Sequence, residues 1–134
     1  MAKRYTLSRN ERLKSRKQIE QLFSNGQRFV SPPFRIFYSF QINKQPDVPY
    51  LLQAGFGASS RNFKTAVERN RIKRLIKEAY RLQKNEVQDK LKEQNKRLYV
   101  FFIYTGKELP VYTEIYNSIT IALAKLLEIN NKIR

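Results

Sequence analysis

The chain of 134 residues contains no cysteine and no histidine, and these two absences exclude several kinds of site. Without cysteine, neither a disulfide framework nor thiolate chemistry is available. Without histidine, the chain lacks the commonest general acid and base, and the two absences together exclude a zinc site in practice. Glycine-rich phosphate loops of the P-loop or dinucleotide type are also missing. If the chain takes part in catalysis, we expect the catalytic groups to come from elsewhere.

Acidic residues are few and scattered, with 11 Asp and Glu against 27 Lys and Arg. The tightest group has steps of three and four and lies on one helical face: Glu86, Asp89 and Glu93. Such a trio can hold a divalent ion, but lysines stand between and beside its members. We therefore interpret it as ordinary solvated ion pairing and predict no metal site and no cofactor in the protein itself.

The formal net charge of +16 is large for a chain of this length. Hydrophobic residues make up 41% of the sequence, so it is not a disordered basic tail but one domain spanning residues 1–134. The charge favours a nucleic-acid partner, whose phosphates neutralise it. The second possible partner for such a charge is an anionic membrane surface, although no segment approaches the ~20 apolar residues of a membrane span. The sequence does not open with the apolar run typical of a secretory signal, so we expect the protein to be located in the cytoplasm.

The segment from Lys64 to Arg81 is the most informative part of the sequence. Its apolar residues recur at steps of three and four, which predicts an amphipathic helix, and Thr65 with Glu68 forms a capping box at its start. We find no acid at helical spacing that compensates the cations, so the wet face is suited to a polyanion. The cations of this helix and of the turn before it are Arg61, Lys64, Arg69, Arg71, Lys73, Arg74, Lys77 and Arg81.

The remaining pattern predicts an α+β fold, a two-layer α/β sandwich with three helices and a small mixed four-stranded sheet. A first helix follows the capping pattern at Ser15 and ends at Asn25-Gly26. Three strands are placed at 34–42, 50–58 and 98–104, with a hairpin-type connection at 43–49. The basic helix extends to about residue 94, and a last helix covers about 112–130. A βαβ unit therefore contains the basic helix.

Alternation along the strand at 34–42 separates its two faces. Phe34, Ile36 and Phe40 point one way, and Arg35 and Phe37 point the other. We expect the second and third helices to cover the first of these faces. The first helix then borders the second face and leaves a cleft.

Three blocks of the sequence resemble the protein subunit of bacterial ribonuclease P. Residues 69–81, RNRIKRLIKEAYR, are similar to that family's Arg-Asn-Arg signature and its basic helix. Residues 55–61, GFGASSR, are similar to the strand and turn before it, although Ser60 stands where the family has lysine. Arg12-Leu13-Lys14, followed by Leu22-Phe23 and Gly26, resembles the family's opening and first helix.

The resemblance implies a subunit that assists a catalytic RNA in hydrolysing one phosphodiester bond, which removes the 5′ leader of precursor tRNA. The partners are then the ribonuclease P RNA and precursor tRNA, not DNA or a membrane. The scissile chemistry and Mg²⁺ belong to the RNA of the holoenzyme, and the protein supplies no catalytic residue. The resemblance also implies a left-handed crossover, whereas the general rule favours right-handed ones.

Two sets of site residues follow from the pattern and the resemblance together. The basic helix with its turn, including Asn70 as a positioned amide, is expected to bind the catalytic RNA. Phe37 is expected to be the main stacking ring for the leader, on a strand where Arg35 replaces the small β-branched residue of many relatives. The full leader-binding set is Arg12, Lys14, Phe23, Arg35, Phe37 and Tyr38.

Two other functions remain open from the sequence. A structural RNA-binding protein, such as a ribosomal protein, would also have a small basic α/β sandwich, because a fold does not determine a function. It would need cations, but not the exposed rings that single-strand recognition uses. A stand-alone nuclease would need a cluster of acids or a histidine, and the sequence shows neither.

Overall fold

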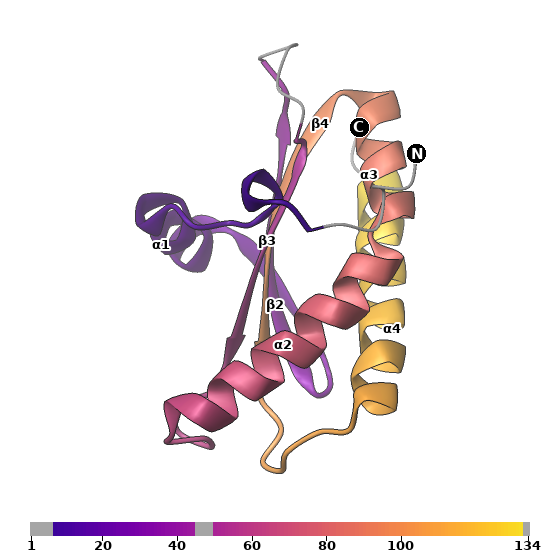
Figure 1. Cartoon of the computed structure of the whole chain (residues 1–134). Helices are drawn as coiled ribbons and strands as arrows, with labels where there is room; N and C mark the ends of the chain where they lie inside the picture. Colours follow the sequence, from indigo (N-terminus) through magenta and orange to yellow (C-terminus); the bar gives the residue numbers. More distant parts are fainter. Residues whose placement is uncertain (1–6, 45–49, 133–134) are drawn as a thin grey trace.

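The structure, a computed structural model, describes residues 7–44 and 50–132 as a mixed β-sheet with helices on both faces (Figure 1). The sheet has the strand order β1-β2-β4-β3. Strand β2 is antiparallel to both of its neighbours, β1 and β4, whereas β4 is parallel to β3 and is joined to it through helices. The elements in chain order are η1 (Arg9–Glu11), α1 (Arg16–Asn25), β1 (Gln27–Ser31), β2 (Phe34–Ile42), β3 (Leu52–Ala58), α2 (Ala66–Gln83), α3 (Asn85–Gln94), β4 (Lys96–Tyr104) and α4 (Tyr112–Lys132). The predicted α+β fold, its mixed four-stranded sheet and its βαβ unit are confirmed.

The two faces of the sheet carry two separate hydrophobic cores. In Figure 1 the sheet is seen nearly edge-on, with α1 on one side and α3 and α4 on the other, while α2 crosses in front. The buried residues of α2 pack in the same core as those of α4. Phe34 and Ile36 of β2 are completely buried in the main core beneath the three helices. Phe37 belongs to a second core with Leu13 and Leu22, on the α1 side. The predicted alternation along β2 therefore assigns these faces correctly.

The basic helix does not run unbroken to residue 94. It ends at Gln83, and α3 begins at Asn85 with a different direction (Figure 1). No proline or glycine marks the break. The residue between the two helices, Lys84, is buried and paired with Glu11, which lies 73 residues earlier in the chain. A local pattern cannot reveal such a partner, so the sequence predicted one helix where there are two.

The fourth strand of the sheet is β1, which the sequence did not place. It pairs with β2 across the short turn at Pro32-Pro33. Strand β3 begins at Leu52, two residues later than predicted. Strands β2 and β3 both pair with β4 and not with each other, so their connection is not a hairpin; residues 45–49 of that predicted connection lie outside the described residues.

The N-terminal segment closes the β3 edge of the sheet. The Leu13 amide donates to the Ala54 carbonyl at 2.8 Å, and the Gln53 side chain donates to the Asn10 carbonyl at 2.9 Å. Leu7 packs against the main core, whereas Leu13 lies in the second core. The segment therefore passes from one face of the sheet to the other around β3, and it covers backbone groups that an open edge would expose.

Candidate RNA-binding surface

Helix α2 presents its cations on a face that starts from a capped N-terminus. Thr65 Oγ1 accepts a hydrogen bond from the Glu68 amide at 3.2 Å, as the sequence pattern predicts. On the opposite face of the helix, the side chains of Ile72 and Ile76 are completely buried. The predicted RNA-binding residues of the helix and its turn lie on the outer side, exposed at Arg61, Lys64, Asn70, Arg71 and Arg74 and half-buried at Arg69, Lys73, Lys77 and Arg81.

Arg69 has a structural contact in addition to its charge. Its Nη1 donates to the Phe63 carbonyl at 2.7 Å, which ties the first turn of α2 to the residues before it. The turn before α2 is fixed to the end of β4 by Asn62, whose side-chain amide donates to the Thr105 carbonyl at 3.1 Å. Sequence reasoning missed Asn62 because its partner lies 43 residues away. Asn70 makes no hydrogen bond within the described part of the chain, so its positioning role stays a prediction.

Arg81 is engaged by an acid of its own helix. Its Nη2 and Nε donate to the two carboxylate oxygens of Glu78 at 2.7 and 3.2 Å. These hydrogen bonds lower the pKa of Glu78 and raise the pKa of Arg81. The expectation that no acid at helical spacing compensates the cations is therefore wrong at this end of α2. A contact between Arg81 and RNA must share the guanidinium with Glu78.

Residues 12–14 bring further cations beside α2. Leu13 is buried, and its neighbours Arg12 and Lys14 are exposed. Partial burial, and then the charges of Arg12, Lys73 and Lys14, lower the pKa of the Lys77 ammonium. The sequence divided these residues between two RNA ligands, but the structure gathers them into one set. We call Arg12, Lys14, Lys73 and Lys77 the four-cation cluster.

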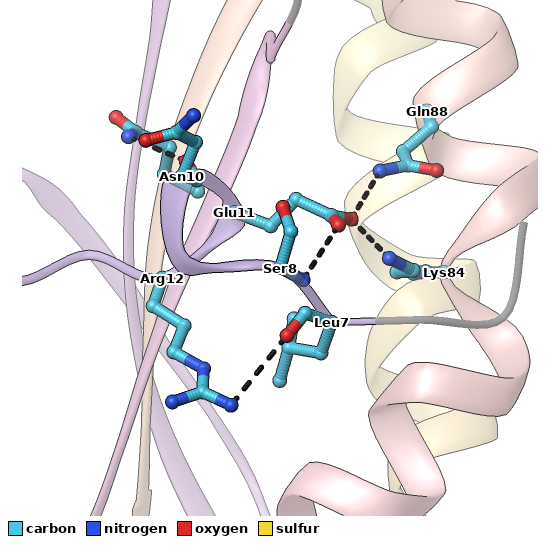
Figure 2. A network of polar contacts seen from close by, with 8 residues as sticks. Leu7, Ser8, Asn10, Glu11, Arg12, Lys84 and Gln88 are labelled. Carbon is cyan, nitrogen blue, oxygen red and sulfur yellow. Dashed lines mark hydrogen bonds and ion pairs between the residues drawn. The ribbon is translucent and has the colours of Figure 1, made fainter. Parts of the chain in front are cut away.

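A buried ion pair fixes the segment that carries Arg12 (Figure 2). Glu11 Oε1 accepts hydrogen bonds from Lys84 Nζ and, at 2.9 Å, from Gln88 Nε2, while Oε2 accepts one from the Ser8 amide at 2.9 Å. Glu11 and Lys84 are only 5% and 1% exposed. Burial raises the pKa of Glu11, but its hydrogen bonds and the charge of Lys84 outweigh that effect and lower it. We call Glu11, Lys84 and Gln88 the clamp. Lys84 is one of the lysines around Glu86, Asp89 and Glu93 that the sequence analysis interpreted as solvated, and its burial shows that this interpretation is wrong for Lys84.

Three phenylalanine rings meet where α1 crosses the second face of the sheet. The Phe23 ring centroid lies 4.7 Å from that of Phe37 and 5.1 Å from that of Phe101. Phe37 is only 8% exposed, whereas Phe23 is 41% exposed. Phe37 is therefore not the open stacking ring that the sequence predicts, because α1 covers it. It supports Phe23, which offers the open surface. We call Phe23, Phe37 and Phe101 the ring cluster.

Two glycines of β3 make room for the ring cluster. A Cβ atom at Gly55 would overlap the Phe101 ring, and one at Gly57 would come within 3.2 Å of it. Phe56, between them, points to the main core, where its ring stacks on Phe102 with centroids 6.0 Å apart. The Gly-Phe-Gly sequence thus lets Phe101 lie flat against β3. Phe101 was not predicted as a site residue, because its strand is apolar on both faces.

The other two predicted leader contacts on β2, Arg35 and Tyr38, lie on opposite faces of the sheet. Arg35 is exposed on the same face as Phe37, as the alternation predicts. Tyr38 is 9% exposed within the main core, on the opposite face from the ring cluster, so the geometry does not support it as a leader contact. Arg28, which sequence reasoning missed because β1 was not placed, is exposed directly opposite Phe37.

The described residues bring no three acidic side chains together as a metal site requires. Glu86, Asp89 and Glu93 are all exposed on α3 and do not form such a group. In the same residues, no helix is long and apolar enough to span a membrane. What the described surface offers is a cationic helix, a four-cation cluster and an open aromatic ring.

A basic helix face together with an exposed aromatic ring beside a sheet is typical of a nucleic-acid-binding protein. Comparison with known proteins narrows this class. The family model for ribonuclease P matches residues 7–127. The ribonuclease P protein component of Porphyromonas gingivalis is 32% identical over 122 residues, which cover 91% of this chain and 87% of that protein. The corresponding protein of Chlorobaculum tepidum is 36% identical over 81 residues, covering 59% and 51% of the two chains.

The solved structure of the RNase P protein from Staphylococcus aureus shares the fold. Its TM-score is 0.62 at 20% sequence identity, and the match covers 87% of this chain and 94% of that one. The chain belongs to the ribonuclease P protein family, and it is a protein subunit for RNA processing.

Proposed function

We propose that this chain binds the catalytic RNA of ribonuclease P and the 5′ leader of precursor tRNA, and thereby assists endonucleolytic removal of the leader. One observation carries the proposal. Leu13 packs in the second core with Leu22 and Phe37, while its neighbours Arg12 and Lys14 act on Lys77 of α2. Three consecutive residues therefore join the cationic helix to the aromatic side of the sheet in one surface.

The two parts of this surface suit two kinds of RNA contact. Lysine and arginine side chains bind phosphates whatever the sequence, which positions a large folded RNA. Residues 69–77 of α2 provide these contacts, with Arg71 and Arg74 the most open. An exposed ring stacks on an unpaired base, which suits a single-stranded leader. Phe23 provides that ring, with Arg35 and Arg28 on the same face of the sheet for the leader phosphates.

The chemical step belongs to the RNA in this proposal. The described part of the chain offers neither histidine nor a set of three acids that would hold Mg²⁺, so the donor set favours metal binding by the RNA. Metal ions bound there would supply the attacking hydroxide and stabilise the leaving oxygen. The residues of this chain bind and orient the RNA. The site of action is the cytoplasm.

Two measurements test the proposal. Precursor tRNA should be cleaved when the chain is added to a bacterial ribonuclease P RNA at low Mg²⁺, and not by the chain alone. The complex should bind precursor tRNA more tightly than mature tRNA. Equal affinity for the two tRNAs would indicate a structural RNA-binding protein, and cleavage by the chain alone would indicate a nuclease; either result would overturn the proposal.

The salt dependence of assembly with the catalytic RNA tests the role of α2 directly. Replacing Arg71 and Arg74 with Ala should lower the slope of log K against log salt by about 0.7–0.9 for each phosphate that the variant no longer neutralises. Arg69 is left in place because its contact with Phe63 is structural. Replacing two exposed lysines of α3 and α4, Lys92 and Lys125, changes the net charge equally and should leave the slope nearly unchanged. Equal slopes for both variants would exclude α2 from the RNA interface.

A further inference from the structure

A polar hollow lies beside α1, on the flank of the helix away from Phe23. Leu22 points at the sheet, and helical spacing of about 100° per residue places Phe23 on one flank and Gln21 and Asn25 on the other. On the sheet, the hollow lies next to Phe37 of β2. Ser39 and Gln41, the next two residues of β2 that point to the same face as Phe37, line it. Its lining consists of Gln18, Gln21, Leu22, Asn25, Gly26, Ser39, Gln41 and Tyr99. We call it the amide hollow.

The lining is rich in hydrogen-bonding groups and contains no charge. Four of its side chains are carboxamides, and two are hydroxyls. Among the side chains of this lining, only those of Gln18 and Tyr99 are joined, by a hydrogen bond of 3.3 Å from Nε2 to the phenol oxygen. The side chains of Gln21, Asn25 and Gln41 make no hydrogen bond to other described residues. A carboxamide donates and accepts at once, which matches the edge of an unpaired nucleobase.

A cation stands at the border of the amide hollow. Arg97 lies directly opposite Gln41 in the β2–β4 register, and its guanidinium carbon is 5.5 Å from the centre of the Tyr99 ring. The Arg97 Nε is buried and has no hydrogen-bond partner among the described residues. An uncharged lining beside an arginine suits a nucleotide, with the base among the amides and the phosphate at Arg97.

The amide hollow and the start of α2 lie toward opposite ends of the sheet, with the ring cluster between them. Helix α2 follows the end of β3 at Ala58, where Gly57 lies beside Ile103 of β4. The hollow lies toward the opposite end of the sheet, where Gln41 pairs with Arg97. Because α1 packs on Phe37 through Leu22, a strand of RNA cannot pass beneath the helix and must cross its outer surface.

We propose that the amide hollow is a second nucleobase site, which holds a leader base further from the cleavage site than the base on Phe23. The inference rests on the proposed function, because it assumes that the leader follows this face of the sheet. It assigns a role to side chains that neither the aromatic nor the cationic part of the surface uses. The hollow contributes only when the leader is long enough to cross α1.

The test uses the holoenzyme with precursor tRNAs whose leaders lengthen by one nucleotide at a time. The wild-type protein should show two separate gains in affinity, the first at the nucleotide on Phe23 and the second at a longer leader. The double variant Gln21→Ala and Gln41→Ala should keep the first gain and lose the second, about tenfold for two hydrogen bonds. Both residues are exposed, so the variant should fold normally. Asn117→Ala removes an exposed amide from α4, on the other face, and should keep both gains.

An abasic nucleotide at the second position provides an independent check. It should weaken binding to the wild-type protein about tenfold and have no further effect on the double variant, because the base and the amides act as one interaction. A double variant that keeps the second gain would overturn the inference, and so would a wild-type protein with only the first gain. A wild-type protein with no leader-dependent gain would overturn the proposed function itself, so the two failures are distinguishable.

Discussion

Removing the lysine of the clamp should destabilise the protein far more than removing any surface lysine. In the variant Lys84→Ala, the Glu11 carboxylate keeps its hydrogen bonds from Gln88 and Ser8 but loses its only positive partner in the clamp. That carboxylate is 5% exposed, so water cannot replace the ammonium group. Leaving a buried charge without its partner costs about 3–5 kcal/mol, which is a large part of the ~5–15 kcal/mol that stabilises a typical domain.

Urea unfolding followed by circular dichroism measures this loss directly. A matched control is the exposed pair of α4, where Lys132 lies 3.6 Å from Glu128 and both side chains are at least 70% exposed. Lys132→Ala should cost less than about 1 kcal/mol, because exposed ion pairs contribute little. The double variant Glu11→Gln with Lys84→Met removes both charges and keeps a hydrogen-bonding side chain at position 11. It should recover most of the stability that Lys84→Ala loses.

The pH dependence gives a second readout of the same pair. The pKa of Glu11 is lowered in the folded protein, so the carboxylate stabilises the fold above its unfolded-state pKa of about 4.3. That contribution should disappear as the pH falls below this value and through the folded-state pKa. The double variant should lack this part of the acid sensitivity. Equal losses for Lys84→Ala and Lys132→Ala, or an unchanged acid profile in the double variant, would refute the reasoning.

Three further predictions concern the RNA-binding surface. Phe23→Ala should weaken binding of precursor tRNA by about one to two decades, as loss of a base–ring stack would, and leave mature tRNA unaffected; equal losses for both would exclude leader stacking. Gly55→Ala should destabilise the fold by about 1–3 kcal/mol in urea unfolding, because the added Cβ overlaps the Phe101 ring, and the second change Phe101→Leu should relieve the overlap. Asn70→Ala should reduce assembly with the catalytic RNA at low Mg²⁺ without changing the unfolding midpoint, since the side chain is exposed; wild-type assembly would make it an ordinary surface residue.

Local patterns predicted those parts of the site that depend on neighbours in sequence. The cap at Thr65, the apolar face of α2 and the two faces of β2 follow from spacing within one element, and the structure has all three. Alternation placed Phe37 on the correct face but could not show that α1 covers it. Whether a ring is open depends on how a separate helix crosses the sheet, and that information is not local.

The features that sequence reasoning missed share a physical cause. The clamp joins Glu11 to Lys84 across 73 residues, and Asn62 joins the end of β4 across 43. Strand β1 has one clear partner in β2, but its own residues are mostly exposed and give no alternation to detect. The clamp and the Asn62 contact depend on residues that are far apart in the sequence, and β1 depends on its pairing with β2, so the local pattern of each segment does not contain the information needed to predict these features.

The closure of the β3 edge by the N-terminal segment has a consequence for the order of folding during synthesis. Residues 7–14 leave the ribosome before the strands and helices that they contact, and Glu11 among them can pair only after Lys84 has followed. At about 5–20 residues per second, translating the 73 residues from the one after Glu11 to Lys84 takes about 4–15 s. During that interval the segment has no strand edge to close, because β3 and its parallel neighbour β4 are also made later. Residues 7–14 are therefore made early but are among the last to be fixed, and a nascent-chain binder that holds them would delay completion of the fold.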